Sequence, residues 1–270
     1  MVKTKPRRKP RPGYGGGDST KSLAENLLYG INPVEAALNA GKRACHRLYL
    51  KTGKPSPKLT ELQRLAGTHG VAVESTSTQD LETLCGSSSH QGVVLACGAL
   101  PLQDESTALA IEKEAHPILV ALDQVEDPRN FGAIVRTCAA FGAAGVVVTR
   151  HHKAPLSASA SKASAGLLES YPLYEAANLA RFLEKAKENG YWIAGTVVNG
   201  GQPLHQYRRD RPLVLVLGNE GRGLRPLVES QCDFNLTIPL QAGISLNVST
   251  AAAVLLYQLG LPSPDGSPSD

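Results

Sequence analysis

The sequence predicts an α/β protein in which a mostly parallel sheet follows a smaller α/β unit. In the second half of the chain, continuous apolar runs alternate with helical patterns, which is typical of strands covered on both faces. In residues 27–99, shorter apolar runs alternate with helices within a span suited to a small sandwich. The chain has 270 residues, 42% hydrophobic and 19% charged, which is enough for two domains with their own cores.

The smaller unit contains three expected strands and three expected helices. Val34, Ala37 and Leu38 form one apolar face, which predicts a helix over residues 33–40. Apolar patterning predicts further helices over 59–66, ended by Gly67, and over 80–84, and strands at 47–50, 71–74 and 92–96. Residues 100–115 are mixed and polar, and we interpret them as a linker with a helical turn.

The larger unit contains five expected strands separated by helices. The strands fall at residues 117–122, 145–149, 191–194, 212–217 and, more weakly, 235–238. The helices fall at residues 131–141, 158–166, 179–189, 226–231 and 246–259. Parallel sheets bind ligands beyond the carboxyl ends of their strands. We therefore expect the chemistry just after Leu122, Leu217 and Ile238.

The positive charge is concentrated at the start of the chain. Residues 1–25 contain seven Lys and Arg and two acidic residues, whereas the rest contains 21 basic and 22 acidic residues. Segment 1–26 is also rich in Pro and Gly, so we expect a disordered basic tail that can contact phosphates. A solubilising extension or a targeting peptide is the alternative. Residues 263–270 are expected to form a second disordered tail.

Cysteine and histidine usage gives no indication of a metal site. The five cysteines are scattered without a C-x-x-C pair, which favours a reducing compartment over disulfides or zinc. His151 and His152 are the one histidine cluster, and adjacent side chains point apart, so a loop pair is expected. No apolar run approaches the roughly 20 residues of a membrane span, and we expect neither membrane association nor a signal peptide.

A polar turn follows the strand that ends at Leu122 and continues into a helix. It contains Asn130 near the expected start of the helix and Arg136 six residues later. Each has a structural explanation, because asparagine often caps helices and arginine is common on their surfaces.

A glycine-rich loop follows the strand that ends at Leu217. Gly218, Gly221 and Gly223 surround Glu220, so the backbone of this loop can approach a ligand closely. The loop lacks the Gly-Lys-Ser/Thr of a phosphate loop, and its spacing differs from the dinucleotide fingerprint of nicotinamide dehydrogenases. An ordinary turn remains the alternative.

The third stretch begins where the strand ends at Ile238. A glycine loop leads to Ser245 and Asn247, and a helix rich in small residues (251–253) begins there. Capping again explains the polar residues one by one.

Taken together and in this order, the three stretches resemble the motifs of the SpoU (TrmH) family of RNA 2′-O-methyltransferases. The resemblance covers roughly residues 116–260, and it implies a methyltransferase domain over residues 116–262. In the smaller unit, residues 29–38 and 90–92 resemble the opening and closing signatures of that family's ribosomal-protein-like RNA substrate-binding domain. This two-domain form is typical of the family's 23S rRNA guanosine methyltransferases and of their mitochondrial counterparts.

The resemblance implies a fold, a cofactor and a set of functional residues. It implies the SPOUT fold with a C-terminal trefoil knot, S-adenosylmethionine as cofactor without a metal, and a homodimer whose active sites use both chains. The implied cofactor contacts are Thr196, Leu217, Gly218, Gly221, Ile238 and Leu246. The implied catalytic residues are Asn130, Arg136, Glu220, Ser245 and Asn247.

The implied reaction moves a methyl group from a sulfonium to a ribose 2′-hydroxyl, so the hydroxyl must lose its proton. The family assigns this work to the motif-one arginine, here Arg136. A guanidinium scarcely deprotonates in a protein, so phosphate binding and stabilisation of the alkoxide are an equal interpretation.

Two rival functions share the fold. A tRNA ribose methyltransferase is disfavoured, because such enzymes usually lack an equivalent of residues 27–99. A non-catalytic RNA-binding or ribosome-assembly protein is disfavoured by the complete set of five implied catalytic residues. We therefore expect an enzyme that acts on rRNA in the cytoplasm, or in the mitochondrial matrix if the source is eukaryotic.

Overall fold

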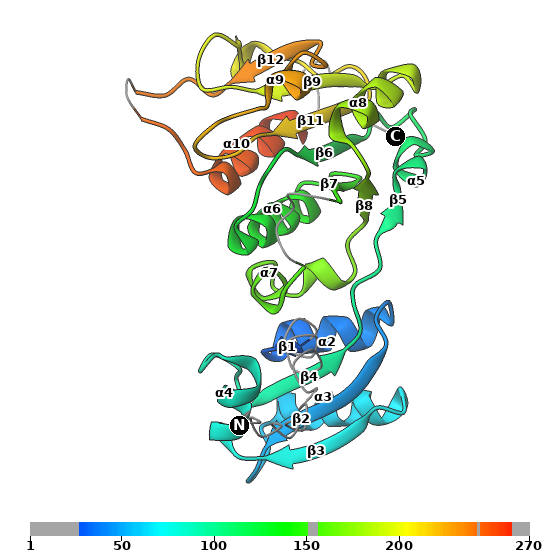
Figure 1. The fold of residues 1–270 in the computed structure, drawn as a ribbon, viewed down its shortest axis with the longest axis vertical. Coiled ribbons are helices and arrows are strands. Elements are labelled where there is room, and N and C mark those ends of the chain that lie inside the picture. Colours follow the sequence, from blue (N-terminus) through cyan, green and yellow to red (C-terminus); the bar gives the residue numbers. More distant parts are fainter. Residues whose placement is uncertain (1–26, 151–155, 242–243, 261–270) are drawn as a thin grey trace, which may run out of the picture.

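The structure of the protein, a computed structural model, describes residues 27–150, 156–241 and 244–260. Figure 1 shows two α/β units that follow one another along the long axis of the molecule. The predictions for the two tails and for the histidine pair at 151 and 152 fall outside the described residues. Within the described residues, no helix is long and apolar enough to cross a membrane.

The first unit is a four-stranded sheet with the order β1-β4-β2-β3 and helices on both faces. Val34 of α2 and Leu59 of α3 pack on one face, and Leu81 of α4 packs on the other. The prediction that Gly67 ends the second helix was wrong, because that helix continues to Thr68. The elements are β1 (Leu27–Tyr29), α2 (Ile31–Ala40), β2 (Cys45–Lys51), α3 (Pro57–Thr68), β3 (Ala72–Thr76), α4 (Thr78–Cys85) and β4 (Val93–Cys97).

The second unit is an eight-stranded sheet with the order β10-β12-β9-β11-β6-β7-β8-β5. Every strand pairing in this sheet is parallel among the described residues, which confirms the predicted sheet type. The strands are β5 (Gln103–Asp104), β6 (Ile118–Leu122), β7 (Gly145–Thr149), β8 (Leu173–Ala176), β9 (Trp192–Thr196), β10 (Gln202–Pro203), β11 (Leu213–Leu217) and β12 (Phe234–Thr237). Strand β5 and the following helix come from the stretch interpreted as a linker.

Helices cover both faces of this sheet, as its continuous apolar strands require. Ile134 of α6, Ala160 of α7 and Leu255 of α10 belong to the core of one face, and Phe182 of α8 belongs to the core of the other. The helical elements are α5 (Glu105–Leu109), α6 (Pro128–Ala140), α7 (Ala158–Ala163), η1 (Leu167–Glu169), α8 (Leu179–Glu188), η2 (Leu204–Gln206), α9 (Pro226–Glu229) and α10 (Val248–Gly260).

The sheet order brings the three polar stretches to one edge. Strands β6 and β11 are neighbours, with Leu122 opposite Leu217, and β9 lies between β11 and β12. Since all these strands run parallel, the loops after Leu122, Leu217 and Thr237 leave the sheet on the same side. The trefoil knot and the ribosomal-protein likeness of the first unit stay predictions.

Candidate active site

Three of the implied catalytic residues form one hydrogen-bonded chain. Asn247 Nδ2 donates to Asn130 Oδ1 at 3.1 Å, and Asn130 Nδ2 donates to Glu220 Oε1. Asn130 is not the helix cap, because α6 begins at Pro128 and the side chain of Asp127 accepts from Arg129 N. The hydrogen bonds from Arg129 also hold the pKa of Asp127 below its ordinary value.

The start of α10 orients this chain. Asn247 Oδ1 accepts from the backbone N of Ser249 at 2.9 Å and from its hydroxyl at 2.6 Å, so Nδ2 of Asn247 must face Asn130. Each amide in the chain accepts on one side and donates on the other. The chain ends at the carboxylate of Glu220, whose Oε2 makes no hydrogen bond with the described residues. Asn130 therefore holds one oxygen of the Glu220 carboxylate, and the other oxygen can accept a further hydrogen bond.

The glycine-rich loop is a tight turn closed on itself. Asn219 N donates to Gly223 O at 3.0 Å, and Gly223 N donates to Asn219 O at 2.9 Å. A Cβ on Gly218 would lie 2.5 Å from the carbonyl carbon of Gly223 and 2.7 Å from Leu224 N. Glycine is thus required at 218 because two backbone segments touch. From the sequence, we predicted only that the glycines let the backbone approach a ligand.

An ion pair that the sequence argument missed holds this turn against the end of β6. Asp123 is fully buried, and its carboxylate accepts from Arg225 Nε at 2.7 Å and from Arg225 N at 2.8 Å. Asn219 Nδ2 adds a bond to Gln124 O at 3.0 Å. A signal was present, because Asp123 directly follows a buried strand at its carboxyl end, where charged residues are costly unless paired.

A cavity lies beside the turn at this edge of the sheet. Its walls include most of the implied site residues, namely Thr196, Leu217, Gly218, Glu220, Ile238, Ser245 and Leu246. Gly221 lies in the same turn but does not line the cavity. The remaining wall residues, which are not among the implied site residues, are Val197, Val198, Asn219, Arg222, Gly223, Leu224, Glu229, Leu236, Leu240, Val248, Ala251 and Leu255.

The composition of the walls suits a nucleoside-like ligand. Aliphatic side chains such as Leu217, Ile238 and Leu246 offer an apolar surface for a flat ring. Glu220 and Glu229 bring carboxylates that can accept from hydroxyl groups or attract a cation. Among the described residues, no group of three or more His, Cys, Asp or Glu could hold a metal ion.

Arg136 stands apart from this cluster. It lies six residues after Asn130 on α6, which turns its side chain by about 120° around the helix axis at 3.6 residues per turn. Arg136 is exposed, and it makes no hydrogen bond or ion pair with the described residues. The structure thus brings together Asn130, Glu220 and Asn247 and leaves the guanidinium of Arg136 open to solvent.

Two family profiles match the chain, one over each unit. The profile of the SpoU rRNA Methylase family matches residues 117–257. The profile described as RNA 2′-O ribose methyltransferase substrate binding matches residues 27–103.

Bacterial proteins resemble the chain over most of its length. The 23S rRNA (guanosine-2′-O-)-methyltransferase RlmB of Shewanella oneidensis is 34% identical over 236 residues, which cover 87% of this chain and 96% of that protein. The RlmB protein of Acinetobacter baylyi is 36% identical over 234 residues, which cover 85% of this chain and 94% of that protein.

Solved structures share the fold. The SpoU methyltransferase AviRb from Streptomyces viridochromogenes, in complex with the cofactor AdoMet, superimposes with a TM-score of 0.75 at 24% identity over 90% of this chain and 92% of that one. An rRNA methyltransferase from Sinorhizobium meliloti gives a TM-score of 0.72 at 25% identity over 86% of this chain and 85% of that one.

The family profile spans the strands and loops that build the cavity, and the relatives match this chain over nearly their whole length. The chain therefore belongs to the SpoU rRNA methylase family.

Proposed function

We propose that this protein transfers a methyl group from S-adenosylmethionine to the 2′-oxygen of a ribose in large-subunit rRNA, at a guanosine. The observation that carries the proposal is the chain from Asn247 through Asn130 to Glu220, which lies beside a cavity at the strand ends. The RlmB relatives, which match both units of the chain, support the rRNA substrate and the guanosine.

The cavity residues would hold the cofactor. Leu217, Ile238 and Leu246 would contact the adenine ring, and Gly218 and Thr196 would complete the wall. The AviRb structure, which shares the fold and was solved in complex with AdoMet, supports the choice of cofactor. When bound, S-adenosylmethionine supplies an electrophilic methyl group on a sulfonium.

The protein's own residues then have to align the ribose hydroxyl and handle its proton. Glu220, held by Asn130, would accept a hydrogen bond from the 2′-hydroxyl, orient its lone pair and take up its proton as the oxygen bonds to the methyl group. Ser245 on the cavity wall would bind the same nucleotide. Arg136, exposed and without a hydrogen-bond partner among the described residues, would bind an RNA phosphate through its planar fork. Because it points away from Glu220 of its own chain, it would stabilise the developing alkoxide in a site shared between the two chains of the proposed homodimer.

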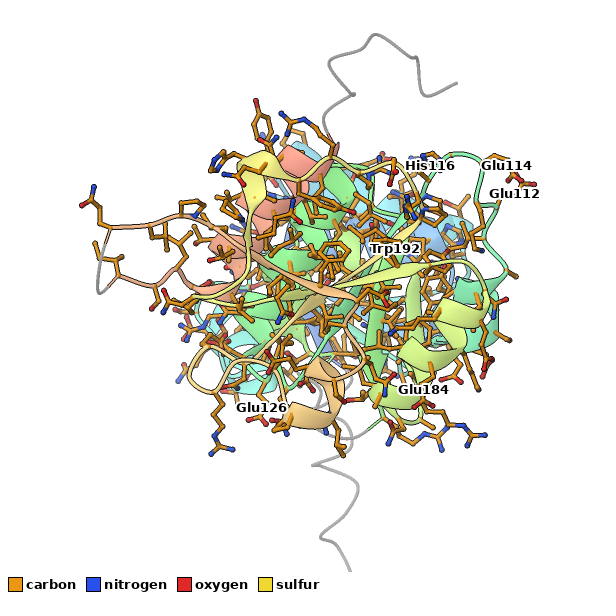
Figure 2. The ribbon with its side chains drawn as sticks, turned by 90° about the horizontal axis from the view of Figure 1, so that it is seen from above. Glu112, Glu114, His116, Glu126, Glu184 and Trp192 are labelled. Carbon is orange, nitrogen blue, oxygen red and sulfur yellow. The ribbon has the colours of Figure 1, made fainter. Side chains whose placement is uncertain are left out.

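RNA affinity is assigned mainly to the first unit and the basic tail. Residues 27–99 contain seven basic and five acidic residues, whereas residues 101–270 contain 14 basic and 17 acidic residues. Figure 2, which looks down on the second unit, shows Glu112, Glu114, Glu126 and Glu184 around its rim. These four side chains are exposed, so they do not favour the binding of a polyanion along this rim.

The active form is proposed to be a homodimer that meets through α6 and α10. Phe141 and Tyr257 are 38% and 56% exposed, and their rings stack edge to face at 5.9 Å. Val254, 38% exposed, belongs to the same helix as Tyr257. At the other end of the two helices lie Asn130 and Asn247, so a partner on this face would reach the site. We also propose that the protein acts in the cytoplasm, which its similarity to bacterial proteins supports, or in the mitochondrial matrix for a eukaryotic source.

The test is transfer of labelled methyl groups from S-adenosylmethionine to RNA. We expect incorporation into 23S rRNA that lacks the modification and none into tRNA. Asn130→Ala should reduce the rate while cofactor binding persists, because the carboxylate of Glu220 loses its support. Preferential labelling of tRNA would favour the tRNA alternative. Tight RNA binding without any transfer would favour a non-catalytic protein.

A further inference from the structure

One short segment of the second unit makes the contact with the first unit. Figure 1 shows α7 between α6 and the elements α2 and β1 of the first unit. At Gly166, just after α7, a Cβ would lie 2.6 Å from Asn32 O and 2.9 Å from Ala36 Cβ. The backbone at Gly166 therefore rests directly on α2, and a side chain at this position would push the two units apart.

Polar contacts flank this backbone contact on both sides. Lys162 Nζ donates to Ser89 O at 2.5 Å and lies 5.2 Å from the centre of the Tyr29 ring. Lys42 Nζ donates to Ser170 O at 2.6 Å. Each of these bonds joins the two units.

A buried ion pair lies at the centre of the contact. Arg43 Nε is 2.6 Å from Glu169 Oε2, Arg43 Nη2 is 3.1 Å from Glu169 Oε1, and the two side chains are 2% and 1% exposed. Arg43 Nη1 also donates to Gly98 O at 3.3 Å. Two parallel bonds between planar groups fix an angle as well as a distance. Removing one partner would leave an uncompensated buried charge.

Helices α7 and α6 connect this contact to the candidate active site. A Cβ on Gly132 of α6 would overlap Ala160 O and lie 2.7 Å from Ala163 Cβ, so the backbones of α6 and α7 touch. Asn130 lies two residues before Gly132. Each unit has its own hydrophobic core, and Ala158 of α7 also packs against the core of the first unit.

We propose that Arg43 and Glu169 are positioning residues, which hold the RNA-binding unit at a fixed distance and angle from Asn130 and Glu220. The proposal rests on the proposed function, because it concerns how RNA bound to the first unit is presented to the site. A buried ion pair is weak evidence for net stability, and in some proteins its role is to specify one arrangement; here that arrangement is the one between the two units. The ribose then arrives already aligned with the cofactor cavity.

The experiment compares the full-length protein with Glu169→Gln and with the matched control Glu105→Gln. Glu105 pairs with Lys185 at 2.5 Å within the second unit, where the two side chains are 14% and 40% exposed. Loss of alignment should lower kcat/KM for rRNA by about a hundredfold in Glu169→Gln, the scale of a small misplacement. Its affinity for S-adenosylmethionine should stay within about twofold of wild type, and the control should match wild type throughout.

Two further measurements separate orientation from unfolding. Small-angle scattering should show a larger radius of gyration for Glu169→Gln while circular dichroism shows both units folded. The swapped variant Arg43→Glu with Glu169→Arg should recover kcat/KM to within about tenfold of wild type, because complementary charges again fix the angle.

The proposal is overturned if Glu169→Gln keeps the wild-type kcat/KM and radius of gyration, or if the swapped variant is no faster than Glu169→Gln. If wild-type protein transfers no methyl group to rRNA, the proposed function fails instead. The scattering comparison then decides by itself whether the pair fixes the orientation of the two units.

Discussion

Replacing Gly218 by alanine tests the geometry of the cofactor turn. The new Cβ would lie 2.5 Å from the carbonyl carbon and 2.6 Å from the carbonyl oxygen of Gly223, distances that real Cβ atoms do not adopt. The turn must open, which breaks the two backbone bonds between Asn219 and Gly223. At about 1 kcal/mol each, their loss lowers the free energy of unfolding by about 2 kcal/mol.

The same opening moves the cavity wall, since Gly218, Asn219 and Gly223 all line it. Loss of a single good contact, about 1.4 kcal/mol, weakens binding about tenfold. Urea unfolding would measure stability, and calorimetric titration would measure the affinity for S-adenosylmethionine. We expect both to fall in Gly218→Ala.

Gly221→Ala is the matched control in the same turn. Its Cβ would meet only Asn219 Oδ1 at 3.7 Å, an ordinary contact, and Gly221 does not line the cavity. Stability and affinity should stay within about 0.5 kcal/mol of wild type, as at other surface sites. The reasoning is refuted if Gly218→Ala behaves like this control, or if Gly221→Ala is the more damaging change.

Three other predictions follow from the same structure. Arg136→Ala and Arg136→Lys should both abolish methyl transfer, since lysine lacks the planar fork, while calorimetric titration should show an unchanged affinity for S-adenosylmethionine. Near-normal turnover of either variant would contradict the role assigned to Arg136. A chain beginning at residue 101 should bind S-adenosylmethionine but lose RNA binding in a filter assay, and full-rate methylation by it would contradict the division of labour. Burial raises the pKa of Cys232 from 9.0 to about 12. Folding therefore favours the neutral thiol, and its contribution to the free energy of unfolding is complete below pH 9 and declines as the pH rises towards 12. In urea unfolding, Cys232→Ala should lose less stability than wild type over this alkaline range.

The apolar pattern of the sequence was sufficient to predict strands that are buried along their whole length. The apolar run at β11 predicted a strand buried along its whole length, and all five residues from Leu213 to Leu217 are buried. Strand β8 was missed, because Tyr174 and Glu175 interrupt its apolar pattern. Glu175 is partly exposed and pairs with Arg150 at 3.3 Å, so this strand does not need a continuous apolar run.

The position of the site was also predictable, because parallel strands place their following loops at one edge. Its internal geometry was not. Asp123 and Arg225 are 102 residues apart, and Arg43 and Glu169 are 126 apart. Periodicity describes neighbours within one helix or strand, so pairs that depend on how distant elements pack leave no local pattern. For Arg136, the motif indicated a role but not that its side chain points away from Asn130.

The most direct test of the central claim is the identity of the methylated nucleoside. The protein would be incubated with labelled S-adenosylmethionine and 23S rRNA that lacks the modification, and the RNA would be digested to nucleosides for mass spectrometry. The account predicts that the label is on the ribose of 2′-O-methylguanosine and that Asn130→Ala strongly reduces it. Label on a base, or no label in RNA when the cofactor is bound, would contradict it.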